Sequence, residues 1–129
     1  ILYLWNSETQ VRTDGVYGRF YRPSLFRFRR GMTFKRTDGH ANLHCSSVPR
    51  NIKRSAQSKA QVLHLGYMHK QDRLRKFEWY RRIDPNNRAE DGYRHIVQGD
   101  IPDVPASARL MHAGPLKLLP LEAFYGRHA

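Results

Sequence analysis

The chain has 129 residues, of which 40% are hydrophobic and 12% aromatic, enough apolar material to bury a core and unlike a disordered composition. Lys and Arg number 23 against 11 Asp and Glu, so the formal net charge of +12 favours an anionic partner such as nucleic acid, anionic lipid or a phosphate-bearing substrate. No apolar run approaches the roughly 20 residues that span a bilayer. The single cysteine cannot form an internal disulfide, so we expect a cytoplasmic protein, free or peripheral at a membrane.

The N-terminal segment is apolar and aromatic over residues 1–5, which predicts a buried strand. It begins without a methionine, and we expect a piece of a longer protein whose upstream part pairs with this strand. Residues 10–15 follow as a predicted turn that brings Arg12 and Asp14 close together. Two interpretations of this pair stay open: a surface ion pair, or a polar loop at the rim of a site.

Residues 24–35 alternate between apolar and basic side chains on both sides of a turn. Phe26 and Phe28 share one face of the first half, and Arg27 and Arg29 share the other. The pattern predicts a β-hairpin whose arginine face looks outward. That face is either a solvated basic surface or a grip for a diphosphate, which arginine binds through charge-assisted hydrogen bonds.

A strand is predicted over residues 61–66, and it contains a histidine. The period of two places Leu63 and Leu65 on one face and His64 on the other. A lone histidine in a strand is either a satisfied interior residue or a metal ligand, since neutral imidazole commonly binds metals.

Two helices are predicted after this strand. Residues 70–84 carry an apolar stripe at three-residue spacing, and their charges complement the helix macrodipole. A second helix is predicted over residues 88–98, where Asn87 and Glu90 form a variant of the capping box. Prolines interrupt residues 101–129, which we expect to wrap the body as a tail. The elements together predict an α/β or α+β fragment with short mixed or antiparallel strands.

Several common catalytic motifs are absent from the sequence. It contains no glycine-rich phosphate loop, no His-Glu-x-x-His and no cysteine pair at metal-binding spacing. Cys45 follows His44 directly, and neighbouring side chains on a strand point in opposite directions, which disfavours a cysteine nucleophile activated by this histidine. No cofactor or complete metal site is therefore evident within this chain.

Four short motifs occur in an order that can be compared with that of a known protein family. They are Ser24-Leu-Phe-Arg-Phe-Arg29 followed by Gly31, Leu43-His44, Val62-Leu-His-Leu-Gly-Tyr67, and a helix rich in Lys, Arg and aromatic residues. In this order and spacing, residues 20–84 resemble the C-terminal half of family 2 glycosyltransferases. The resemblance implies a GT-A fold, a mixed α/β sandwich, in which residues 1–100 form the acceptor-side half and residues 101–129 a wrapping tail.

The resemblance also implies the partners and the site. A nucleotide-sugar donor and a divalent cation, Mg or Mn, would bind the full-length protein, which would transfer the sugar to a sugar or lipid acceptor. The net positive charge adds an anionic membrane surface as a further expected partner. His44 and His64 match the family's two histidines, and Arg27 matches its Leu-Phe-Arg arginine. The expected assignments are His64 as a metal ligand and Arg12, Asp14, Arg27 and His44 as substrate-binding residues, with the arginines facing the leaving diphosphate.

Two departures from the family pattern bear on activity. Cys45 stands where the family has a glutamate after His44, and no residue here matches the family's general base. The family's Asp-x-Asp, whose oxygen atoms hold the metal, matches nowhere in the sequence and is expected upstream of Ile1. We therefore expect this part of the protein to be inactive by itself.

A different class of function stays open beside the transferase. The charge of +12 and the aromatic residues near the arginines suit a nucleic-acid-binding module, in which Phe20, Tyr21, Phe26 and Phe28 would stack on bases. A purely structural or interaction domain is the third alternative.

Overall fold

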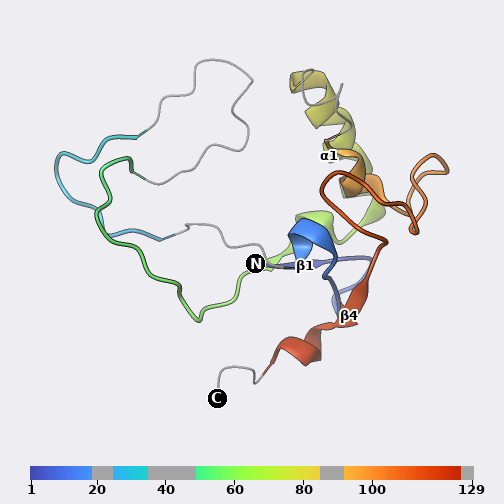
Figure 1. Cartoon of the computed structure of the whole chain (residues 1–129), viewed down its shortest axis with the longest axis horizontal. Helices are drawn as coiled ribbons and strands as arrows, with labels where there is room; N and C mark the ends of the chain where they lie inside the picture. The colour runs from blue at the N-terminus through green and yellow to red at the C-terminus, as the bar shows by residue number, and fades with distance from the viewer. Residues whose placement is uncertain (19–24, 35–48, 85–91, 126–129) are drawn as a thin grey trace.

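A computed structural model describes residues 1–18, 25–34, 49–84 and 92–125, and Figure 1 shows the whole chain. The described part is a small α+β structure with one α-helix and a four-stranded mixed sheet, in agreement with the predicted α+β class. Short 3₁₀ helices carry the label η. The elements in chain order are β1 (Leu2–Leu4), β2 (Gln10–Arg12), η1 (Gly15–Tyr17), β3 (Leu63–His64), η3 (Leu65–Tyr67), α1 (Lys70–Ile83), η4 (Arg94–Val97), β4 (Leu118–Pro120) and η5 (Leu121–Phe124).

The sheet has the strand order β3-β1-β2-β4, which joins the N-terminal, middle and C-terminal parts of the chain (Figure 1). β1 runs parallel to β3, with Tyr3 opposite His64, and antiparallel to β2. β4 pairs antiparallel with β2 on the other side. The strand predicted over residues 1–5 is confirmed as β1. The expectation that its partners lie upstream is wrong, because β1 has a strand on each side within this chain.

β3 corresponds to the strand predicted over residues 61–66, but it is only two residues long. It lies at the edge of the sheet, where Leu63 and Leu65 are exposed and His64 is half-buried. The chain then turns sharply through η3, because Met68 donates its N–H to the carbonyl of Leu65. This turn returns Tyr67 to the side of the sheet that carries His64.

α1 confirms the helix predicted over residues 70–84 and ends at Ile83. Asp72 lies in its first turn and two arginines in its last, where each charge opposes the helix dipole. Its apolar face packs on the segment that follows, through a core of Phe77, Tyr93, Ile96, Val97 and Val104. No helix of the described residues has both the length and the hydropathy to cross a membrane.

The hairpin predicted over residues 24–35 is wrong in its described part, residues 25–34. The described residues 25–34 contain a turn in which Met32 donates its N–H to the carbonyl of Arg29 at 3.3 Å, but no strand. Phe26 and Phe28, which were to form the buried face, are exposed. A hairpin requires an apolar face covered by other elements, and in Figure 1 this segment lies away from the sheet and the helix.

The second predicted helix, over residues 88–98, is also wrong in its described part. A turn at residues 92–93 leads into the 3₁₀ helix η4. Ile96, Val97 and Gln98 are all fully buried although they are consecutive. An α-helix on a protein surface buries only one stripe of residues, so burying three in a row requires a tighter and less regular path.

The C-terminal segment contains a strand that the sequence did not predict. β4 forms the edge of the sheet beside β2, with Leu119 opposite Val11. Leu121 extends the pairing by donating its N–H to the carbonyl of Thr9 at 2.7 Å. Leu118 packs on the second apolar cluster, whose buried members are Tyr3, Trp5 and Tyr17.

Candidate functional site

His64 lies at the carboxyl end of β3 among aromatic rings. Its ring centroid is 4.7 Å from that of Tyr3 on β1 and 4.9 Å from that of Tyr67 on η3. The two tyrosines are themselves stacked with centroids 5.7 Å apart. In α/β sheets, ligands bind beyond the carboxyl ends of parallel strands, and β3 and β1 are such a pair. We call Tyr3, His64, Tyr67 and the adjoining Lys76 the His64 cluster.

Lys76 reaches this cluster from α1. Its Nζ lies 4.5 Å above the centroid of the Tyr67 ring, in a cation–π contact. A Cβ atom at Gly66 would clash with this Nζ and would lie 3.0 Å from Cε1 of His64. Because Gly66 has no side chain, Lys76 and His64 can both lie close to the backbone at this position. Burial lowers the pKa of Lys76, and the Asp72 carboxylate opposes this shift only in part.

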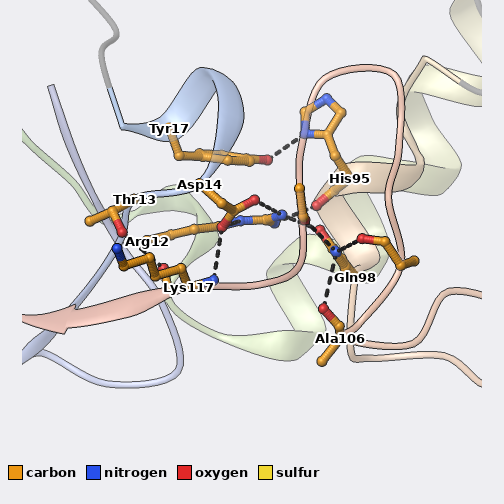
Figure 2. A network of polar contacts seen from close by, with 10 residues as sticks. Arg12, Thr13, Asp14, Tyr17, His95, Gln98, Ala106 and Lys117 are labelled. Carbon is orange, nitrogen blue, oxygen red and sulfur yellow. Dashed lines mark hydrogen bonds and ion pairs between the residues drawn. The ribbon is translucent and has the colours of Figure 1, made fainter.

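Arg12 and Asp14 form the predicted ion pair, but they do so inside the molecule (Figure 2). Nε and Nη2 of Arg12 donate to the two oxygens of Asp14, both at 2.9 Å, in a bidentate contact. Nη1 donates to the carbonyl of His95 at 2.6 Å, and Nη2 also donates to Oε1 of Gln98. The Arg12 side chain is 0% exposed. The pair is therefore not a surface ion pair, and each nitrogen of the Arg12 guanidinium donates a hydrogen bond within the protein.

Gln98 extends this network to the C-terminal loops (Figure 2). Its Nε2 donates to the carbonyls of Ala106, Ala108 and Gly114 at 3.2, 2.9 and 2.9 Å. Since Oε1 accepts from Arg12, one buried amide joins β2 to the segment between η4 and β4. The network therefore holds β2 against the loops between η4 and β4.

Tyr17 connects the Arg12 network with the His64 cluster. Its ring lies 4.2 Å from the guanidinium carbon of Arg12 and packs edge-on against Tyr3 at 5.1 Å. Its hydroxyl lies 2.5 Å from Nδ1 of His95. Burial raises the pKa of Tyr17 well above its usual value of 10.0, although Arg12 opposes the shift. The aromatic rings thus form one continuous layer from His64 to Arg12.

The structure brings some of the predicted site residues together and not others. His64, Arg12 and Asp14 belong to neighbouring clusters joined through Tyr3 and Tyr17. Arg27 is exposed on the segment of residues 25–34, which Figure 1 shows away from β1, the strand that pairs with β3. His44 lies outside the described residues.

His64 has no complete metal site around it in the part of the chain that is described. Within residues 1–18, 25–34, 49–84 and 92–125, no three His, Cys, Asp or Glu side chains are grouped so that they could hold a metal ion. Its role as a metal ligand stays a prediction, and further ligands would have to come from outside these residues. Comparison with protein-family models, with curated proteins and with solved structures finds no match to this chain.

Three residues of these clusters were not singled out from the sequence. Gln98 and His95 lie more than 80 positions from Arg12, so no local pattern could reveal their contacts. Lys76 looks like one of many basic residues on an exposed helix face. Its one sequence signal is the glycine at position 66, which offers room for a side chain from another element.

Proposed function

We propose that this chain is the acceptor-side part of a GT-A glycosyltransferase, which transfers a sugar from a nucleotide-sugar to a sugar or lipid acceptor. The observation that carries the proposal is the position of His64, a half-buried histidine at the carboxyl end of a strand in a parallel pair. The order of the motifs in residues 20–84 supports the same function. The rest of the site, including the carboxylates of an Asp-x-Asp, would come from another part of the full-length protein.

The chemistry of the site would divide between these parts. A bound Mg or Mn ion would neutralise charge on the diphosphate leaving group. His64 would offer one imidazole nitrogen to this ion, and the packing of Tyr3 and Tyr67 against the ring would fix its orientation. Arg12 and Asp14 act here by positioning the strands, because the guanidinium of Arg12 is buried and fully hydrogen-bonded.

The proposal is tested by thermal unfolding of the full-length protein with a nucleoside diphosphate and Mn²⁺. A ligand at 100 times its Kd stabilises the folded state by about 2.7 kcal/mol. We expect the melting temperature of the wild-type protein to rise only when both nucleotide and metal are present. His64→Ala should abolish most of this rise and strongly reduce sugar transfer.

His69→Ala is the matched control, because His69 is exposed and lies only five positions further along. It should keep both the stabilisation and the transfer. Equal stabilisation of the two variants, or none in the wild-type protein, would contradict the proposal.

The exposed segment of residues 25–34 favours a second candidate function, binding of single-stranded nucleic acid. Phe26 and Phe28 are 41% and 74% exposed and alternate with the exposed Arg27 and Arg29. Bases stack on aromatic rings, and arginines bind the phosphates. Single-stranded RNA affinity that is high at low salt and falls log-linearly as salt rises would support this function. Unchanged weak binding across the salt range would exclude it.

A further inference from the structure

Lys76 is a half-buried cation of the His64 cluster that forms no salt bridge within the described residues. Among the described residues, the ion pairs of α1 are Arg73 with Asp100, Arg75 with Asp72, and Arg81 with Glu78. Within the described residues, the Lys76 ammonium contacts the face of the Tyr67 ring. Burial lowers the pKa of Lys76 by more than the negative charge of Asp72 raises it, so the ammonium is incompletely compensated within the fold.

The Lys76 ammonium and the His64 imidazole approach each other above Gly66. Both would be in close contact with a Cβ at this glycine, so both lie next to the same small volume. A group placed there would meet a positive charge from α1 and an imidazole from β3. An oxyanion suits this pair, because lysine donates up to three charge-assisted hydrogen bonds.

The same lysine also faces an open hollow on the outer side of α1. The hollow has a volume of about 620 Å³, and its lining residues are Arg75, Lys76, Glu78, Trp79 and Arg82. Three of the five carry a positive charge and one is acidic, so the hollow attracts anions. A phosphate-bearing ligand can therefore reach Lys76 from solvent along a surface of matching charge.

We propose that Lys76 binds the diphosphate of the nucleotide-sugar beside His64 and stabilises the charge that develops on it when the sugar leaves. The assignment rests on the proposed transferase function. It gives Lys76 the role that the sequence suggested for Arg12, whose guanidinium is occupied inside the fold. Lys76 differs from Arg12 in that it is only half-buried and forms no salt bridge among the described residues.

The test is the binding of inorganic pyrophosphate to the full-length protein in the absence of metal, measured by calorimetry. We expect Lys76→Met to raise the Kd of pyrophosphate about tenfold or more, since a hydrogen bond to a charged group is worth about a factor of ten. Gly66→Ala should weaken binding in the same direction, because its methyl group displaces the Lys76 ammonium.

Lys70→Met is the matched control, since it removes the same charge from an exposed position of the same helix. It should change the Kd by less than about twofold. Equal effects of Lys76→Met and Lys70→Met would overturn the assignment, and so would a wild-type protein that does not bind pyrophosphate.

The test separates this assignment from the proposed function. If Mn²⁺ and a nucleoside diphosphate stabilise the protein through His64 while Lys76→Met behaves like Lys70→Met, the assignment to Lys76 is wrong and the transferase function stands. If pyrophosphate binding depends on Lys76 but nucleotide and Mn²⁺ have no effect, the anion site stands and the transferase function is wrong.

Discussion

At the scale of single residues, the fold buries two arginines, whose positive charges are costly to remove from water. Arg12 and Arg73 are almost fully buried, and each guanidinium carbon lies 4.4 Å from the ring of Trp5. Each also makes a bidentate contact with an aspartate, Asp14 for Arg12 and Asp100 for Arg73. A buried charge is tolerated only when it is paired and hydrogen-bonded, so these residues depend strongly on their partners.

Arg12→Met tests this dependence. The substitution leaves the buried Asp14 carboxylate without its cation, and losing one partner of a buried pair costs about 3–5 kcal/mol. We expect a loss of this size in the free energy of unfolding, measured by urea denaturation. Arg75→Met breaks an exposed pair with Asp72 and should cost less than about 1 kcal/mol. Similar losses in the two variants would show that the Arg12 pair is not a buried support.

At the scale of elements, Arg73 is the residue that fastens α1 to the sheet. Besides Asp100, it donates to Oδ1 of Asn6 at 2.9 Å and to the carbonyls of Tyr67 and Met68 at 2.7 and 2.9 Å. These acceptors belong to the turn after β1 and to the connection between β3 and α1. One side chain therefore fixes the helix next to the His64 cluster and sets the position of Lys76 one turn further along.

Arg73→Met should release the start of α1. The substitution removes all of these hydrogen bonds and leaves Asp100 buried without its cation, at a cost of about 3–5 kcal/mol. We expect faster amide hydrogen exchange in α1 together with the loss of stability. Arg82→Met, at an exposed position near the end of the same helix, should leave the exchange rates almost unchanged. Unaltered exchange in Arg73→Met would contradict the anchoring role.

The scale of elements also shows what the sequence could predict. β1, β3 and α1 were predicted because each has a local pattern: an apolar run, an alternation or a helical stripe. β2 and β4 have three residues each, and β4 ends at a proline. Their pairing joins residues 106 to 110 positions apart, which no local pattern reveals. The failed hairpin had the right alternation, but alternation forms a strand only where another element covers its apolar face.

The candidate site was predictable to a similar degree. His64 and the Arg12–Asp14 pair stand out in the sequence, because one is a histidine within a strand and the other joins opposite charges two positions apart. The burial of the pair and the approach of Lys76 to Gly66 could not be predicted. Both result from tertiary packing, in which α1 and the segment around Gln98 close over the sheet.

At the scale of the whole molecule, a layer of aromatic rings joins the parts of the fold. Tyr3 of β1, Tyr17 of η1 and Tyr67 of η3 pack against one another, and Trp5 contacts both Tyr17 and Tyr67. Burial raises the pKa of Tyr67 far above its usual value of 10.0, as it does for Tyr17. The folded state therefore keeps these hydroxyls protonated under conditions where the unfolded chain would lose the protons.

This coupling predicts how stability depends on pH. A raised pKa in the folded state contributes stability that is complete below the unfolded pKa near 10 and is lost as the pH rises above it. We expect the free energy of unfolding to fall as the pH rises above about 10. Tyrosinate absorbance should report ionisation of the buried tyrosines together with unfolding, and helical circular dichroism should change in the same transition. Ionisation of all tyrosines in a still-folded protein would contradict the burial of this layer.

One of the two tryptophans is buried and the other is exposed, so their fluorescence reports on two different parts of the protein. Trp5 is 1% exposed within the aromatic layer, whereas Trp79 is 43% exposed in the hollow beside Arg75 and Arg82. An anionic quencher such as iodide gathers near these arginines and should reduce the emission of Trp79 while leaving that of Trp5 intact. Quenching by iodide thus distinguishes the tryptophan of the interior from the tryptophan of the basic hollow. A phosphate ligand bound in the hollow should protect Trp79, and not Trp5, from this quenching.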